Sequence, residues 1–394
     1  MNIDVDRARA QTPGCSERIH FNNCGAALMP TPVIDAFKAH IDLEASIGGY
    51  EAAQAADDRI ESTYAAIARL LNCERDEVAL VENATRGWDM AFYALDFEPG
   101  DRILTGVAEY ASNYIPYLQV ARKRGAVIEV VPDDTSGALD VDALRNMMDE
   151  RVKLISVTHV PTNGGLVNPA AEIGAVAREH GVPYLLDACQ SAGQMPLDVQ
   201  AIGADMLSAT SRKFLRGPRG CGFLYVRREW IERLEPPFLD LHAATWESAG
   251  RYRIRADARR FENWESDVAA RIAFGVAVDY ALAWGLEAIE ARVVALAERL
   301  RRRIEEIPGA RVLDKGARRC AIVSFGIDGH APDALVEGLG ERGINLGVSR
   351  AASTLLDMNG RHTGELVRAG VHYYNTEDEV DACAAALAEL AAAR

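Results

Sequence analysis

The 394-residue sequence predicts an α/β fold: a large domain with a mostly parallel sheet between helices, and a smaller α+β domain toward the C-terminus. Two observations predict this fold. Between residues 75 and 230, short continuous apolar runs alternate with helical patterns, as in a parallel sheet that helices cover on both faces. From about residue 266 the pattern becomes helical, and shorter strand and helix patterns follow it.

The elements follow one another in a regular order. In the large domain, the expected strands cover residues 77–83, 101–106, 127–132, 152–160, 182–188, 204–210 and 221–228. The expected helices between them cover residues 85–97, 112–125, 140–149, 169–181 and 198–203. Two longer helices are expected at 267–285 and 286–309, the second ended by Pro308 and Gly309. The smaller domain continues through residues 319–327, 333–343, 344–349, 366–376 and 378–394.

Net charge, the length of the apolar runs and the cysteine pattern exclude several classes of function. The formal net charge of -15 argues against nucleic-acid binding, which usually needs a basic face. Charges interrupt the apolar runs before the ~18 residues that a membrane span requires, and the first residues do not resemble a signal peptide. The seven cysteines are scattered without a CxxC pair, which argues against disulfides or a zinc site and for a reducing compartment. We therefore expect a cytoplasmic protein with no metal, membrane or nucleic-acid partner.

Polar residues that directly follow strands are the first candidates for a site, because ligands bind beyond the carboxyl ends of parallel strands. Asp187 ends one strand, and a buried carboxylate needs a partner; capping of the next helix is the alternative interpretation.

Lys213 follows the next strand, in "LSATSRKFLRGPRG". Like charges nearby lower the pKa of a lysine, and a neutral amine can form a Schiff base. An ordinary surface lysine is the alternative. The crowding residues are Arg212, Arg216 and Arg219.

Two further signals lie at the starts of helices. Ala84, Thr85 and Gly87 stand where a strand gives way to a helix, and a helix N-terminus binds phosphate well. Simple capping by Asn83 or Thr85 is the alternative. Tyr110 follows a strand and could lay its ring on a flat cofactor, although a half-buried tyrosine needs no such role.

These four signals together fit one cofactor, pyridoxal 5'-phosphate (PLP). PLP needs a lysine for its aldehyde, an acid to keep its pyridine nitrogen protonated, a phosphate cup and a platform for its ring. The sequence therefore predicts a PLP-dependent enzyme. A catalytically silent protein of the same fold is the alternative from another class, and the joint presence of lysine and acid argues against it.

Residues 185–228, beginning "LLDACQSAGQMP", resemble the cofactor-binding segment of the class V aminotransferase superfamily, and the similarity extends over nearly the whole chain. The resemblance implies the fold of aspartate aminotransferase. It implies a large PLP-binding domain at residues 20–285 and a small domain made of residues 1–19 and 286–394. A homodimer is expected, because sites of this family usually lie between subunits.

The resemblance also implies roles for individual residues. Lys213 would form the Schiff base, Asp187 would pair with the pyridine nitrogen, and Gln190 would contact the phenolic oxygen. Thr162 or Asn163 would lie beside the ring, and Tyr110 takes the place of a stacking histidine. The residues expected to hold the phosphate are Ala84, Thr85, Thr210 and Arg212.

Substrate contacts are implied at two further positions. Arg368, in "VRAGVHYYNTEDEVD", falls where the family has the arginine that binds the substrate carboxylate, and a structural salt bridge is the alternative. Asn23, in "FNNCGAALMP", is the other expected substrate contact. Glu265 falls where relatives carry a small hydroxyl residue near the neighbouring subunit's phosphate, which leaves that contact open.

The expected reaction is inferred from the residues that are present and absent in the segments expected near the substrate. Residues 344–368 contain no cysteine, which disfavours a persulfide-type cysteine desulfurase. "IGGYEAAQAA" and "EYASN" resemble isopenicillin N epimerases and hercynylcysteine sulfoxide lyases instead. Tyr110 could pass a proton to a leaving group. The sequence therefore favours a C–S β-lyase acting on an α-amino acid, with an amino-acid epimerase or an aminotransferase as alternatives.

Overall fold

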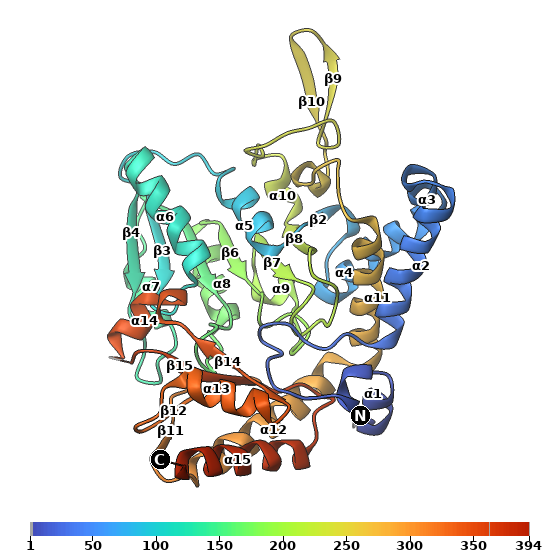
Figure 1. Cartoon of the computed structure of the whole chain (residues 1–394). Coiled ribbons are helices and arrows are strands. Elements are labelled where there is room, and N and C mark those ends of the chain that lie inside the picture. The colour runs from blue at the N-terminus through green and yellow to red at the C-terminus, as the bar shows by residue number, and fades with distance from the viewer. Residues whose placement is uncertain (1–2, 362, 394) are drawn as a thin grey trace.

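A computed structural model describes residues 3–361 and 363–393 of the chain. A seven-stranded sheet lies at its centre (Figure 1). Its strands are β2 (Val78–Val81), β3 (Arg102–Gly106), β4 (Val127–Val131), β5 (Val152–Thr158), β6 (Tyr184–Asp187), β7 (Met206–Thr210) and β8 (Gly222–Val226). Their order is β2-β8-β7-β6-β5-β3-β4, and β8 alone runs antiparallel to both of its neighbours.

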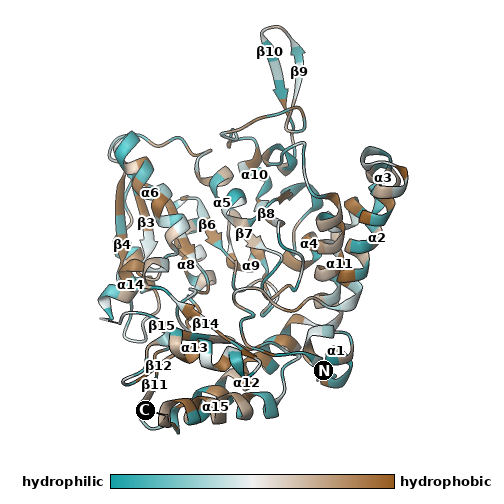
Figure 2. Cartoon of the chain, viewed as in Figure 1, coloured by the Kyte–Doolittle hydropathy of each residue, from teal (hydrophilic) through white to brown (hydrophobic). Residues whose placement is uncertain are grey.

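Most residues of these strands are apolar and buried because helices cover both faces of the sheet, whereas the edge strand β4 is partly exposed. Every residue of β2, β3, β6, β7 and β8 is buried. Figure 2 shows hydrophobic residues concentrated on these central strands. The predicted fold class, with a mostly parallel sheet between helices, is confirmed.

Helices connect the strands and close the sheet at one end. The connecting helices are α5 (Ala84–Phe92), α6 (Ala111–Arg124), α7 (Val141–Asn146), α8 (Ala170–His180), α9 (Val199–Ile202) and α10 (Arg228–Ile231). Beyond β2, the long helix α11 (Val268–Trp284) packs against α2 (Thr31–Ile47) and α4 (Asp57–Leu71), and α3 (Gly49–Ala55) joins these two. Short 3-10 helices are η1 (Pro13–Ser16), η2 (Arg75–Glu77), η3 (Ala258–Phe261) and η4 (Ala351–Ser353).

A second, antiparallel sheet is built from the C-terminal part of the chain. Its order is β11 (Ala310–Val312), β12 (Ile322–Ile327), β15 (Leu366–Gly370) and β14 (Gly347–Ser349). The helices of this part are α12 (Leu286–Glu305), α13 (Pro332–Glu341), α14 (Leu355–Gly360) and α15 (Glu377–Ala392). The N-terminal segment, with α1 (Val5–Ala10), reaches this part, since β1 (Ile19–His20) pairs in parallel with β13 (Ile344–Asn345).

A hairpin of β9 (Ala244–Ser248) and β10 (Arg251–Ile254) projects away from the rest of the chain (Figure 1). Its Trp246 is 80% exposed. Within the described residues, no helix taken singly has the length and apolar character that a membrane crossing needs. The pair α11 and α12, bent by 78° at its break, meets that test of length and composition.

Candidate active site

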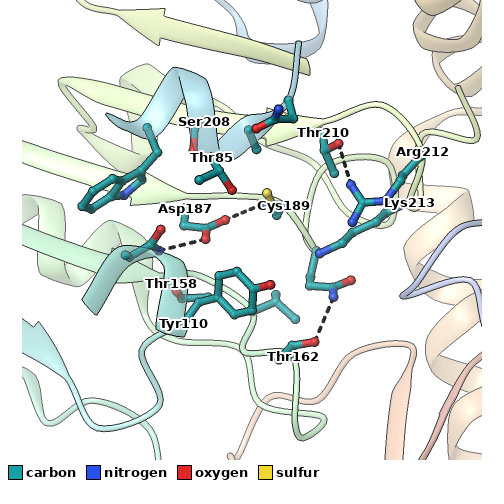
Figure 3. Close-up of a pocket in the computed structure, with 16 residues that line it drawn as sticks. Thr85, Tyr110, Thr158, Thr162, Asp187, Cys189, Ser208, Thr210, Arg212 and Lys213 are labelled. Carbon is teal, nitrogen blue, oxygen red and sulfur yellow. Dashed lines mark hydrogen bonds between the residues drawn. The ribbon is translucent and has the colours of Figure 1, made fainter. Parts of the chain in front are cut away.

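A pocket opens at the carboxyl ends of three neighbouring strands of the large sheet. Thr158, Asp187 and Thr210 are the last residues of β5, β6 and β7, and all three line it (Figure 3). The cavity has a volume of about 240 Å³. It lies where ligands bind in sheets of this kind. The pocket brings together most of the residues that the sequence singled out: Ala84, Thr85, Tyr110, Thr162, Asp187, Gln190, Thr210, Arg212 and Lys213.

Lys213 lies in the turn after β7, and its side chain reaches into the pocket (Figure 3). Burial lowers the pKa of its amine below the ordinary value of 10.5, and Arg212 and Arg368 add to this effect. Cys189 and Asp187 act in the opposite direction. The lowered pKa agrees with the expectation from the sequence, although burial, rather than crowding by arginines, is its main cause.

The other two arginines of this turn do not face the pocket. Arg216 is 1% exposed and has a left-handed backbone, with φ of 59°. Its guanidinium donates to the backbone oxygen of Leu28 at 2.8 Å, to the hydroxyl of Tyr373 at 2.6 Å and to the hydroxyl of Thr12. Arg216 therefore braces the lysine turn against both ends of the chain. Arg219 is exposed.

Each of the two carboxylate oxygens of Asp187 accepts a hydrogen bond from a neighbouring residue. Oδ1 accepts a hydrogen bond from the backbone N–H of Cys189 at 2.9 Å, and Oδ2 accepts one from Nδ2 of Asn113 at 3.0 Å. The residue is 5% exposed. Because β6 is fully buried up to this residue, the carboxylate has a fixed position at the pocket floor.

The start of α5 forms a wall suited to an anion. The Asn83 side chain caps the helix by accepting from the backbone N–H of Arg86 at 2.9 Å. The N–H groups of Ala84 and Thr85 in this first turn have no acceptor within the helix, so they can bind a ligand.

A cationic side chain belongs to the same anion-binding wall. Nη1 of Arg212 donates to the hydroxyl of Thr210 at 3.1 Å, and both residues line the pocket. A phosphate at this wall would therefore meet backbone donors, hydroxyl groups and one guanidinium, which is the donor set that phosphate needs.

The remaining walls carry an aromatic ring and two polar side chains. Tyr110 precedes α6 and is 36% exposed, and Figure 3 shows its ring between Asp187 and Thr162. Nε2 of Gln190 donates to the backbone oxygen of Cys24 at 3.1 Å and approaches the hydroxyl of Thr162 at 3.4 Å. The amide of Gln190 is thereby oriented with its oxygen free.

Unpaired polar atoms in the pocket indicate that it is built for a polar ligand. Within the described residues, Oε1 of Gln190, Oγ of Ser208 and Nε1 of Trp88 are buried and have no hydrogen-bond partner. All three residues line the pocket. Buried polar atoms are normally paired, so a bound molecule with donors and acceptors around a flat ring fits them. The residues present thus fit PLP.

Arg368 lies next to this pocket. It belongs to β15 of the C-terminal sheet, and its Nη1 donates to the backbone oxygen of Thr162 at 3.3 Å and to the Thr162 hydroxyl. Its buried Nε has no partner within the part of the chain that is described. Arg368 forms no salt bridge there either, so its positive charge is available to an anionic ligand.

Besides Arg368, two predicted residues lie outside the lining of the pocket. Nδ2 of Asn163 donates to the hydroxyl of Thr354 at 2.7 Å, which ties its loop to the segment before α14. Asn23 is fully buried, and its Nδ2 donates to the backbone oxygen of Gly370 at 2.7 Å. Their expected roles in cofactor and substrate binding stay predictions. Glu265 lines a separate surface cavity beside Trp264.

Several pocket residues were not found from the sequence. Glu109 stands behind the pocket, close to the end of β3, where the argument used for Asp187 could have singled it out. Asn113 lies in the first turn of α6, three residues after Tyr110, and both residues line the pocket. Asn83, expected only as a possible helix cap, also lines the pocket, and the lining residues not expected from the sequence are Trp88, Asn113, Thr158, Val160, Cys189 and Ser208.

Fold and site together define a PLP-dependent enzyme. The family described as "Aminotransferase class-V" matches residues 19–383, so the chain belongs to this family. The resemblance seen in the sequence is confirmed, and PLP is the cofactor.

Known relatives and solved structures point to sulfur chemistry. A probable cysteine desulfurase of Methanothermobacter thermautotrophicus is 28% identical over 393 residues, covering 98% of each chain. The apo structure of a cysteine desulfurase from Thermococcus onnurineus NA1 superposes with a TM-score of 0.92 at 26% identity, covering 100% of this chain and 99% of that one. The cystine C–S lyase C-DES, in complex with its product cysteine persulfide, has a TM-score of 0.85 at 26% identity, covering 96% and 99%.

These comparisons correct the expected reaction. A C–S β-lyase similar to hercynylcysteine sulfoxide lyases, with an epimerase or aminotransferase as alternatives, was favoured, and a persulfide-type cysteine desulfurase was disfavoured. That prediction was wrong, because the relatives are named cysteine desulfurases and a neighbour holds cysteine persulfide. The error has a physical reason. The absence of a cysteine at residues 344–368 bears on which group accepts the sulfur. The residues of the cofactor pocket, in contrast, determine which bond of the substrate breaks.

Proposed function

We propose that this chain removes the sulfur of cysteine and delivers it to a thiol outside its own pocket. The proposal is supported by a cavity lined by Lys213 and Asp187, with Arg368 beside it on Thr162, in a chain similar along its whole length to cysteine desulfurases. A lysine, an acid and a carboxylate-binding arginine are the groups that PLP chemistry on an α-amino acid requires.

The chain's own residues divide the work of binding. Arg368 binds the substrate carboxylate with a guanidinium held in place by Thr162. Lys213, whose burial lowers the pKa of its amine, holds the cofactor and moves the proton of the substrate α-carbon. Tyr110 covers one face of the ring. When bound, PLP supplies the electron sink that stabilises negative charge on the substrate.

The acceptor of sulfur is proposed to be an external thiol. Residues 344–368 contain no cysteine, and burial raises the pKa of the pocket thiol Cys189 well above its ordinary value, which makes it a poor nucleophile. In the proposed reaction the C–S bond of cysteine breaks and an S–S bond to the acceptor forms. Cysteine and a thiol thus give alanine and a persulfide, with no oxidant or reductant consumed.

The test is a product analysis of the holoenzyme. The enzyme is incubated with L-cysteine and excess dithiothreitol, and alanine, sulfide and pyruvate are measured in parallel. We expect alanine and sulfide in equal amounts, and neither with Lys213→Ala. Pyruvate in place of alanine, or no sulfide, overturns the proposal.

We also propose a homodimer in the cytoplasm. The support for a second copy is apolar exposure: Trp246 is 80% exposed, Tyr50 75% and Leu241 69%. The support for a reducing compartment is that all seven cysteines, which lie within the described residues, are free. Light scattering at working concentration tests the dimer, and a monomer mass contradicts it.

A further inference from the structure

A second buried carboxylate, Glu109, stands behind Asp187. Glu109 is 4% exposed and lies between β3 and α6. Neutral donors surround it on all sides, from β3, β5 and α6. They are the hydroxyl of Thr105 at 3.1 Å, the N–H of Tyr110 at 2.9 Å, Nδ2 of Asn113 at 2.8 Å, the N–H of Thr158 at 3.0 Å and the hydroxyl of Thr158.

One amide joins the two carboxylates. The two N–H groups of an asparagine side chain can each donate once, and Asn113 gives one to Oε1 of Glu109 at 2.8 Å and one to Oδ2 of Asp187 at 3.0 Å. Both carboxylates therefore act as acceptors from the same nitrogen. The orientation of Asp187 toward the pocket thus depends on Asn113, and the orientation of Asn113 depends on Glu109.

Among the residues that the structure describes, no cation pairs with Glu109. Its titratable neighbours are Asp187 at the end of β6, Tyr184 on the same strand and Tyr117 on α6. Burial, with a smaller contribution from the charge of Asp187, raises the pKa of Glu109 to about 7, against hydrogen bonds that favour ionisation. Its charge therefore changes near neutral pH.

We propose that Glu109 is a positioning residue for the cofactor: through Asn113 it holds Asp187 against the pyridine nitrogen, and it places a second negative charge behind that contact. The negative charge of Glu109 favours the protonated form of the bound cofactor, because that form carries an additional positive charge. This role of Glu109 depends on PLP binding to Lys213 and does not depend on the reaction proposed above. An experiment can therefore contradict one proposal and leave the other intact.

The test compares Glu109→Gln with a matched control, Glu262→Gln. Glu262 is also a buried glutamate, 1% exposed, but it accepts from Tyr64 and Leu80 away from the pocket. Two properties are measured without any substrate: the dissociation constant of PLP, and the midpoint of the pH titration of the visible absorption of the Lys213-bound cofactor. For Glu109→Gln we expect about tenfold weaker binding and a midpoint lower by roughly 0.5–1 pH unit, because loss of a nearby negative charge disfavours the protonated form.

Two further variants separate positioning from folding. In Asn113→Ala the link between the two carboxylates is cut, so adding Glu109→Gln should weaken PLP binding much less than it does in the wild type. If Glu109→Gln does not fold, Thr105→Val removes one donor to Glu109 at 3.1 Å and should lower the midpoint in the same direction. An unchanged midpoint and affinity in the folded Glu109→Gln or, failing that, in Thr105→Val overturns the proposal, as does an equal effect of Glu262→Gln.

Discussion

The guanidinium of Arg368 lies against Thr162, to whose backbone oxygen it donates at 3.3 Å. Arg368 comes from the C-terminal sheet and Thr162 from the loop after β5, so this contact joins the two sheets at the edge of the cofactor pocket. Thr162 in turn approaches Gln190 at 3.4 Å. A substrate carboxylate bound by Arg368 is thereby placed within reach of the groups that surround the cofactor.

Replacement of Arg368 should weaken substrate binding and leave cofactor binding intact. In Arg368→Lys the charge remains but the two-pronged geometry is lost, so we expect KM for cysteine to rise by roughly 10- to 100-fold. Steady-state kinetics measures KM, and a fluorescence titration measures PLP affinity. Arg350→Lys is the control, since Arg350 is exposed and pairs with Asp333. An unchanged KM in Arg368→Lys contradicts the assignment.

Asp187→Asn should weaken binding of the cofactor rather than binding of the substrate. An asparagine keeps the size of the side chain but cannot offer a charged acceptor to the pyridine nitrogen, so PLP affinity is expected to fall by roughly 10- to 100-fold. Equilibrium dialysis against PLP gives the constant. Asp205→Asn serves as the comparison, because Asp205 pairs with Arg227 away from the pocket. Equal affinities for wild type and Asp187→Asn exclude the proposed contact.

The stability of the cofactor-free protein should depend on pH through Glu109. Its pKa is about 7 in the folded chain against an ordinary 4.5, so the folded state holds the proton more tightly. The stabilisation is therefore complete below about pH 4.5 and is lost as the pH rises through about 7, a change of roughly 3 kcal/mol. Denaturant midpoints measured at pH 5 and pH 7.5 check this. Wild type should lose stability relative to Glu109→Gln between these values; a constant difference between the two contradicts the prediction.

Arg216 should matter for stability through its three acceptors. Arg216→Met would leave Thr12, Leu28 and Tyr373 without their buried donor, so we expect a loss of about 3 kcal/mol and a lower melting temperature. Thermal denaturation followed by circular dichroism measures it. Arg219→Met, three residues away and exposed, should melt as the wild type does. Identical melting of the two variants would refute the bracing role.

The large sheet is predictable because its strands are mostly apolar, and β5, β6 and β7 end in the polar residues Thr158, Asp187 and Thr210. That pattern led to Asp187, Lys213 and Thr85. The residues that support them were harder to find: Glu109 and Asn113 act through hydrogen bonds that only the folded chain brings together.

Other features depend on contacts between distant parts of the chain. Arg216 was grouped with Lys213 by sequence, yet its partners are Thr12, Leu28 and Tyr373. The hairpin of β9 and β10 is almost wholly exposed, so burial in a core does not determine its position, and the sequence pattern did not predict it. The domain boundaries at residues 20–285, with 1–19 and 286–394, stay a prediction.

Chemical trapping can show whether Lys213 anchors the cofactor. The holoenzyme is reduced with borohydride, which fixes a lysine-bound cofactor, and is then digested and analysed by peptide mass spectrometry. We expect the phosphopyridoxyl group on the peptide that contains Lys213 and on no other. A label on a different lysine, such as Lys315 or Lys153, or no label on a protein shown to bind PLP, would contradict it.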